Sequence, residues 1–183
     1  IQEPDAFMAL PLQRDFYARN LKNAKERTVV IISDAMRYEV GKELFRRMQD
    51  DPKCTAKLEV QLSVLPSYTR LGMAALLPHA ELTMMDDFKV LIDGMPCDNL
   101  AEREAVLHKY SKDSTCVQFD NIKSLKVVEL RRIFTGKQVV YVYHNQIDPR
   151  GDKPNTEDEV FVACQEAIAE IIDLIRRIST SAN

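Results

Sequence analysis

The sequence has no long hydrophobic run, no excess of one charge and no closely spaced cysteines. Its longest apolar runs fall well short of the ~20 residues that a membrane span needs. A formal net charge of -3 and a pI near 5.7 give the chain no general attraction for nucleic acid. The four cysteines form no C-x-x-C pair, so neither a zinc knuckle nor a redox motif of that kind is expected.

Several enzyme signatures are also missing. The sequence contains no GxxxxGK[ST], GxGxxG, HExxH or GxSxG motif, and no internal repeat. No signal peptide is visible, so we expect reduced thiols and a cytoplasmic location. The chain opens at Ile1 instead of Met and stops directly after a predicted helix. We therefore expect it to be a piece of a larger protein.

What the sequence does contain is typical of a globular α/β domain. With 183 residues, 45% of them hydrophobic, the chain can build one core. We expect a single domain over 1–183, with a small insertion or cap at about 80–98 that carries two weak strand-like runs, 82–85 and 90–92. Strands alternate with helices, which favours a mostly parallel sheet with helices on both faces. The predicted strands are 28–33, 57–64, 115–119 and 139–143, and the predicted helices are 12–23, 38–49, 69–77, 99–110, 124–134 and 156–180.

An aspartate directly follows the first predicted strand. Asp34 comes after a Val/Ile-rich run of the kind buried on both faces of a parallel sheet. At the carboxyl end of such a strand, a carboxylate can ligate a hard cation. The alternative is that Asp34 caps the helix that follows, and the local sequence leaves both open.

A hydroxyl group lies at the start of a later helix. Thr69 follows Pro66-Ser67-Tyr68 and opens the predicted helix at 69–77. The backbone N–H groups at a helix start favour anions such as phosphate, and a threonine becomes a nucleophile when a base or a metal activates it. The alternative is a plain helix cap, formed by Ser67 or by Thr69 itself.

A third group of polar residues follows the strongest predicted strand. Asp148 and Asp152 have the spacing Asp-x-x-Gly-Asp, which lets a tight turn present two carboxylates to one ion. His144 and Asn145 are further candidate ligands or hydrogen-bond donors. The alternatives are a solvated Asx-Pro turn and a strand-end histidine that bonds to the backbone.

Together, these groups predict a divalent-metal hydrolase with an activated nucleophile. Because each group follows a strand or turn of the same predicted sheet, we expect the side chains of Asp34, Thr69 and Asp148 to lie within roughly 10–12 Å of one another, the span of a two-metal site.

The order of these segments resembles the alkaline phosphatase superfamily. That superfamily has a metal-binding Asp after the first strand and a Pro-(Thr/Ser)-x-Thr motif whose last residue is the nucleophile. Pro66-Ser67-Tyr68-Thr69 matches this motif and puts Thr69 in the nucleophile's place. A later Asp-x-x-Gly-His of the superfamily has the spacing of Asp148 and Asp152, which the resemblance makes metal ligands.

The chain also resembles the PglZ domain of bacterial phage-resistance systems of the Pgl and BREX type. The matching segments are Ile32–Glu39, Leu65–Arg70 and Tyr143–Asp148, and the resemblance covers roughly residues 28–178. It implies an alkaline phosphatase-like fold and other components of a phage-resistance system as partners. It also implies a phosphoester or nucleic-acid substrate, with no membrane partner. Arg37 or Arg70 is expected to contact a phosphate oxygen.

Two departures from the superfamily pattern bear on the metal. Asp152 replaces a histidine, so manganese or magnesium becomes as plausible a cofactor as zinc. The superfamily's Asp-His pair and its final histidine are not in this chain, so we expect a partial, truncated site that binds metal weakly or not at all and an inactive fragment. The rival hypothesis is a phosphatase-fold scaffold within a defence complex. A receiver-like domain would explain Asp34 but not the other two groups.

Overall fold

The computed structural model describes residues 10–147 and 157–181. By its contacts the chain divides into two compact units. The first comprises residues 1–28, 59–116 and 138–140, and the second comprises residues 29–58, 117–137 and 141–183. Within the described ranges, no helix combines the length and apolar character that crossing a membrane requires.

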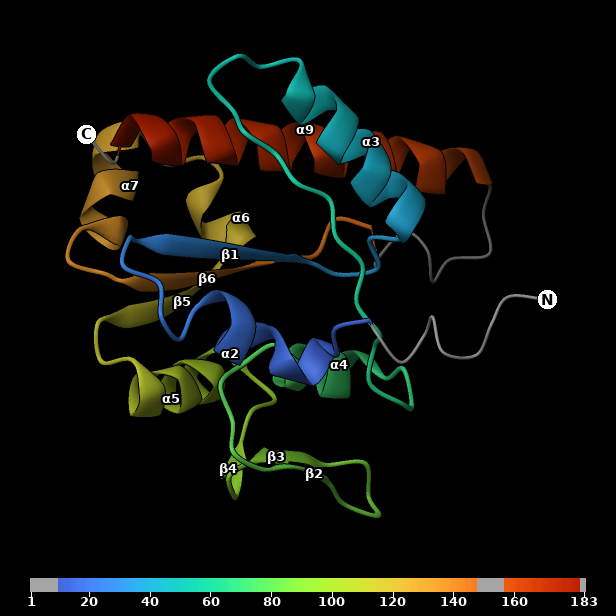
Figure 1. The fold of residues 1–183 in the computed structure, drawn as a ribbon. Coiled ribbons are helices and arrows are strands. Elements are labelled where there is room, and N and C mark those ends of the chain that lie inside the picture. The colour runs from blue at the N-terminus through green and yellow to red at the C-terminus, as the bar shows by residue number, and fades with distance from the viewer. Residues whose placement is uncertain (1–9, 148–156, 182–183) are drawn as a thin grey trace. The chain divides into compact units, whose positions relative to one another are not determined.

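Helices and strands alternate along much of the chain (Figure 1). The strands are β1 (Thr28–Ser33), β2 (Leu82–Met84), β3 (Val90–Ile92), β4 (Met95–Pro96), β5 (Ser114–Gln118) and β6 (Val139–His144). The α-helices are α2 (Phe16–Asn20), α3 (Tyr38–Gln49), α4 (Thr69–Ala75), α5 (Leu100–Tyr110), α6 (Phe119–Ile122), α7 (Val127–Phe134) and α9 (Glu157–Ser181), and the 3-10 helix η1 (Gln13–Asp15) precedes α2.

The main sheet has the strand order β1-β6-β5. The amide of Thr28 donates to the carbonyl of Gln138, and the amide of Asp34 donates to the carbonyl of His144, both at 2.9 Å. In both bonds the acceptor lies the same number of positions after the donor in the sequence. The strands β1 and β6 therefore run in the same direction. All six residues of β6 are buried, as the middle strand of a parallel sheet requires. The predicted α/β class, a parallel sheet flanked by helices, is confirmed.

In the second unit, the long helix α9 packs against α3 and α7 (Figure 1). Its buried residues recur at helical spacing, which gives it one apolar face. They are Ala163, Ala167, Ile168, Ile171 and Leu174. Polar contacts tie its neighbours to it: Arg176 pairs with Asp51 at 3.4 Å, and Arg47 donates to the side-chain oxygen of Gln165.

In the first unit, β2, β3 and β4 form a small antiparallel sheet. Leu82 pairs with Ile92 and Met84 with Val90, so the weak strand-like runs predicted here are confirmed as strands. Val90 and Ile92 are fully buried and anchor the sheet to the core of the unit.

The predicted second strand over 57–64 is wrong. Among the described residues, this segment makes one isolated parallel bridge, between Leu12 and Leu62. Lys57, Glu59 and Gln61 are exposed. A strand needs a ladder partner, and the place beside β6 that this segment might have taken belongs to β5.

The predicted start of the helix at 124–134 is also wrong. Helix α7 begins at Val127 with Lys126 as its N-cap residue. The carboxylate of Glu129 accepts from the amide of Lys126 at 2.7 Å and fixes this later start. The short helix α6, which the sequence did not predict, occupies the chain just before it. By contrast, Asn99, the first residue of the predicted helix at 99–110, is the N-cap residue of α5.

Candidate functional site

Asp34 directly follows β1 and lies at the carboxyl end of the parallel sheet. It is half-buried, and its Oδ1 accepts from the amide of Ala35 at 3.0 Å. Ala35 has φ 57, so the chain turns sharply after the aspartate. The alternative that Asp34 caps the next helix is wrong, because α3 begins at Tyr38 with Arg37 as its N-cap residue.

Thr69 is the first residue of α4, and it is exposed. Tyr68 takes the N-cap position, and no side chain makes a cap hydrogen bond there. The alternative that Ser67 or Thr69 acts as a helix cap is therefore wrong. The amide of Tyr68 donates to the carbonyl of Pro66 at 2.8 Å, which closes the turn that leads into the helix.

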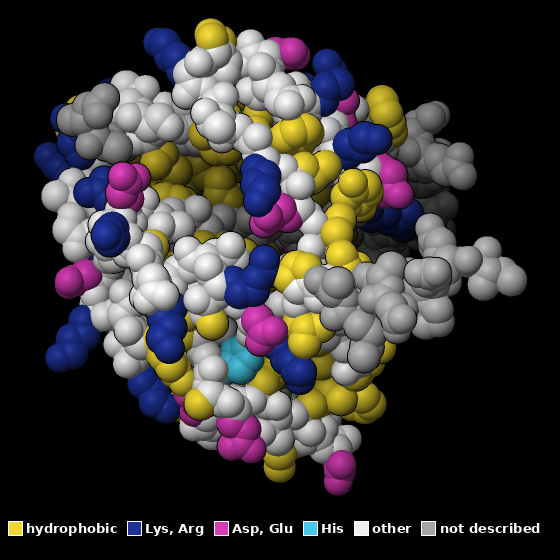
Figure 2. All heavy atoms as spheres, in the orientation of Figure 1, with side chains coloured by type: hydrophobic (Ala, Val, Ile, Leu, Met, Phe, Trp, Pro, Cys, Tyr) yellow, Lys and Arg dark blue, Asp and Glu magenta, His cyan; other side chains and the backbone are white. Residues whose placement is uncertain are grey.

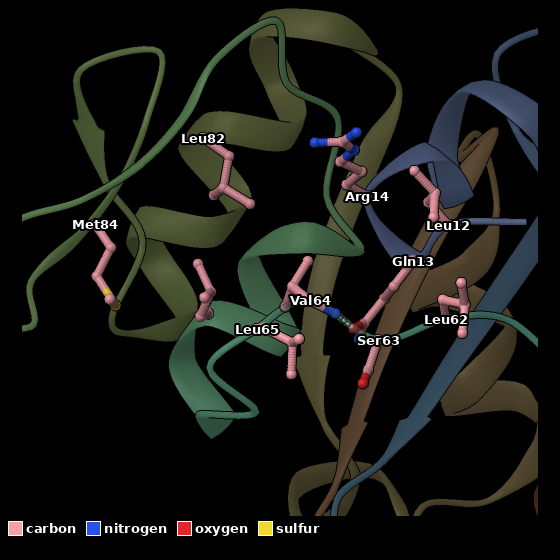
Figure 3. Close-up of a pocket in the computed structure, with 10 residues that line it drawn as sticks. Leu12, Gln13, Arg14, Leu62, Ser63, Val64, Leu65, Leu82 and Met84 are labelled. Carbon is pink, nitrogen blue, oxygen red and sulfur yellow. Dashed lines mark hydrogen bonds between the residues drawn. The ribbon is translucent and has the colours of Figure 1, made fainter. Parts of the chain in front are cut away.

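One glutamine side chain holds both ends of the segment that carries Thr69. The Oε1 atom of Gln13 accepts from the amide of Val64, and its Nε2 atom donates to the carbonyl of Gly72, each at 3.1 Å. Figure 3 shows the first of these bonds at the wall of a cavity of about 420 Å³ in the first unit. Leucines 62, 65 and 82 also line this cavity. Gln13 thus fixes the backbone before and after Thr69.

His144 ends β6 with its side chain in the core. Its residue exposure is 1%, and its ring nitrogens face the side chains of Ser33 and Glu170. The alternative of a strand-end histidine bonded to the backbone is wrong, since both partners are side chains. Asn145, the next residue, is exposed.

The two candidate phosphate-binding arginines have different surroundings. Arg37 is exposed at the N-cap position of α3. Arg70 pairs with Asp98, with 3.7 Å between Nη1 and Oδ1, and its side chain remains half exposed. Over the described residues on the face shown in Figure 2, basic and acidic side chains are interspersed and not grouped by sign.

Cys97, the residue before the Arg70 partner Asp98, is not expected to act as a nucleophile. Burial raises the pKa of the Cys97 thiol to about 11, and the neighbouring Asp98 adds to the increase. The thiol therefore stays protonated at neutral pH, and a protonated thiol is a poor nucleophile and metal ligand.

The second pair of predicted metal ligands, Asp148 and Asp152, lies outside the described residues. In residues 10–147 and 157–181, no group of three or more His, Cys, Asp or Glu side chains has the geometry of a metal site. Of the three aspartates predicted as metal ligands, Asp34 lies within the described residues. Its half-buried carboxylate suits a hard cation. Asp34 and Thr69 belong to different units, so the predicted spacing between the three groups stays a prediction.

Sequence reasoning assigned no role to Gln13, Ser33 or Glu170. Glu170 lies 26 positions after its partner His144, and Gln13 lies 51 positions before Val64. No local pattern marks such a contact, because its two partners meet only when their elements pack.

Residues 15–183 match the family described as the BREX system PglZ alkaline phosphatase-like domain. The chain belongs to the PglZ family. The match takes in β1 with Asp34, the turn with Thr69 and the β6 strand, so the resemblance inferred from the motifs is confirmed. The alkaline phosphatase-like description of the family also agrees with the parallel sheet.

Two curated relatives of this PglZ domain cover nearly all of it. It is 38% identical to the alkaline phosphatase-like protein PglZ of Bacillus cereus (strain H3081.97) and 38% identical to the alkaline phosphatase-like protein BrxZ of Escherichia coli O9:H4 (strain HS). Each match covers 92% of this chain and 20% of the relative, so the chain spans about a fifth of the length of these proteins. No solved structure matches it.

Proposed function

We propose that the protein containing this domain is a metal-dependent phosphoester hydrolase of a bacterial phage-resistance system. The observation that carries the proposal is the match of residues 15–183 to an alkaline phosphatase-like domain of BREX systems. The positions of two residues support it: Asp34 directly follows the parallel strand β1, and Thr69 is exposed at the start of a helix.

In the proposed reaction, Thr69 is the nucleophile. Its Oγ1 forms a bond to phosphorus as the bond to the leaving oxygen breaks, and the hydroxyl proton passes to a base or to solvent. Water then attacks the phosphothreonine, releases phosphate or a phosphomonoester and restores the hydroxyl. Arg37 or Arg70 would donate to the phosphate oxygens. Because Arg70 already pairs with Asp98, binding through Arg70 would require that pair to open.

The proposed cofactor is a pair of divalent ions; Asp34 would hold one of them, and Asp148 with Asp152 would hold the other. Such ions supply positive charge, which lowers the pKa of a hydroxyl group and balances the charge on phosphate oxygens. Carboxylate ligands suit manganese and magnesium as well as zinc. The further ligands would come from the parent protein beyond this chain.

The proposed partners are the other components of the phage-resistance system, and the proposed location is the cytoplasm. Both relatives are alkaline phosphatase-like proteins, named PglZ and BrxZ. The substrate is a phosphoester, and a nucleic-acid phosphodiester is one member of that class.

Substitution of the proposed nucleophile in the full-length protein tests the proposal. We expect Thr69→Ala to abolish hydrolysis of phosphomonoesters and phosphodiesters, measured with Mn²⁺, Mg²⁺ and Zn²⁺ supplied separately. Thermal stability should change little, because Thr69 is exposed and caps nothing. Asp34→Ala should also strongly reduce the rate of hydrolysis, because it removes a metal ligand.

Thr55→Ala, another exposed threonine, is the matched control and should retain the wild-type rate. Arg131→Ala on α7 is a second control. Full activity of Thr69→Ala, or a wild-type protein without metal-dependent hydrolysis, would favour the scaffold within a defence complex.

A further inference from the structure

His144 is buried between side chains from two other elements. Its Nδ1 atom lies 2.9 Å from Ser33 Oγ at the end of β1, and its Nε2 atom lies 2.9 Å from Glu170 Oε2 on α9. The ring of Phe119 meets the imidazole edge to face, with 4.7 Å between ring centroids. The histidine is therefore held by β1, by α9 and by an aromatic ring.

The hydrogen bonds of these three polar side chains are mutually consistent. An ionised carboxylate only accepts hydrogen bonds, so Glu170 places the imidazole hydrogen on Nε2. The Nδ1 atom then accepts from the hydroxyl of Ser33, and a neutral imidazole satisfies both partners. Burial of a histidine without partners would cost free energy, which this pairing offsets.

The same histidine also holds Asp34 through the backbone. The carbonyl of His144 accepts from the amide of Asp34 at 2.9 Å. Ser33, the partner of the ring, is the residue directly before Asp34. A displacement of the imidazole would therefore be transmitted to Asp34 in two ways. One is through Ser33, and the other is through the hydrogen bond from the amide of Asp34 to the carbonyl of His144.

We propose that Ser33, His144 and Glu170 form a positioning relay that orients Asp34 at the carboxyl end of the sheet. His144 is also the last residue of β6, so its contact with Ser33 holds the carboxyl ends of β1 and β6 together. This inference rests on the proposed function, in which Asp34 and Asp148 hold metal ions.

The burial of His144 makes it a positioning residue. His144 is 1% exposed and both of its ring nitrogens are engaged, so it is not available to touch a substrate. Partners that orient metal ligands typically contribute about 10–100-fold in metal affinity or activity.

Two amide substitutions of His144 separate the two halves of the relay in the full-length protein. His144→Asn places an amide near the position of Nδ1, so it keeps the contact with Ser33 and loses Glu170. His144→Gln reaches toward Glu170 and loses Ser33. Glu170→Ala and Ser33→Ala remove the outer partners, and Glu170→Gln keeps an acceptor oxygen and should rescue part of the effect. Asp173→Ala, an exposed carboxylate on the same helix, is the control.

Three measurements follow for each variant: Mn²⁺ affinity by calorimetry, kcat and KM for bis-p-nitrophenyl phosphate, and hydrogen exchange of the peptide that contains Asp34. We expect Mn²⁺ affinity and kcat to fall about 10–100-fold in His144→Asn and Glu170→Ala, with little change in KM. Amide exchange should become faster near Asp34 in these variants and in Ser33→Ala, and the control should match the wild type.

Wild-type Mn²⁺ affinity and exchange in His144→Asn, Glu170→Ala and Ser33→Ala would overturn the relay. If the His144 variants fail to fold, Ser33→Ala and Glu170→Ala decide the question by the same measurements. A wild-type protein that binds Mn²⁺ but hydrolyses no phosphoester would contradict the proposed function alone. Calorimetry and hydrogen exchange would still show whether the relay orients Asp34. A wild-type protein that binds no divalent metal would overturn both.

Discussion

At the scale of single residues, side chains that bond to distant backbone groups hold the candidate site in shape. Gln13 is the example in the first unit, where its amide group bonds to the backbone on both sides of Thr69. The sequence around Thr69 supplies the turn into the helix, but the clamp comes from a residue far earlier in the chain.

We predict that Gln13→Ala destabilises this chain by about 1–3 kcal/mol, because two partly buried backbone groups lose their partners. Urea denaturation measures the change. Gln49→Ala, an exposed glutamine at the end of α3, is the matched control and should lie within about 0.5 kcal/mol of the wild type. Equal stability of Gln13→Ala and the wild type would show that the clamp is dispensable.

Asp93 is a second residue with many partners. Burial alone would raise the pKa of its carboxyl group, but hydrogen bonds from Tyr110, from the amides of Glu81 and Ala80 and from Lys109 outweigh burial and lower it well below its usual value. Because the pKa is lower in the folded state than in the unfolded chain, ionised Asp93 stabilises the fold above the unfolded value of about 4. This contribution is lost as the pH falls toward the folded value.

We therefore predict that the stability difference between the wild type and Asp93→Asn is largest near pH 7 and shrinks below about pH 4. Urea denaturation at a series of pH values measures it. Asp86→Asn, which replaces an exposed carboxylate between β2 and β3, is the control. A difference that stays constant from pH 7 to pH 3 would contradict the assignment.

At the scale of elements, the position at which a helix begins decides which residue caps it and so stabilises it. Helix α5 has a capping box, in which Asn99 Oδ1 accepts from the amide of Glu102 at 2.9 Å and the Glu102 carboxylate accepts in return from the amide of Asn99 at 3.3 Å. Ser124, the first residue of the predicted helix at 124–134, lies before the start of α7 and caps nothing there.

These two residues give a paired test. We predict that Asn99→Ala destabilises the chain by about 1 kcal/mol, whereas Ser124→Ala changes its stability by less than about 0.5 kcal/mol. Thermal or urea denaturation of the two variants compares them directly. An equal loss in both would mean that the helix α7 extends back to Ser124 in solution.

At the scale of the whole molecule, the ligand count predicts weak metal binding by this chain alone. Asp34 on one side and Asp148 with Asp152 on the other supply about one or two protein ligands for each ion, below the three typical of catalytic zinc. We expect calorimetry to find no tight, stoichiometric binding of two ions to this chain, in contrast to the full-length protein. Tight binding of two ions would mean that the chain holds further ligands.

The strongest local patterns of the sequence were enough to place several elements. The Val/Ile run predicted β1 at Thr28–Ser33, the helical spacing predicted α3 at Tyr38–Gln49, and the fully apolar run predicted the buried strand β6. The motifs that follow these elements were also enough to indicate the PglZ family. In each case the signal lies within a few neighbouring residues.

Only the tertiary structure decided which elements pair and which side chains meet. Residues 57–64 alternate weakly like a strand but have no ladder partner, while β5 lies beside β6. The bonds of His144 to Ser33 and Glu170 join residues that lie far apart in the sequence. Periodicity and capping residues specify the faces and ends of an element. The partners of a strand or of a buried polar side chain depend on how distant elements pack, and no local pattern records that.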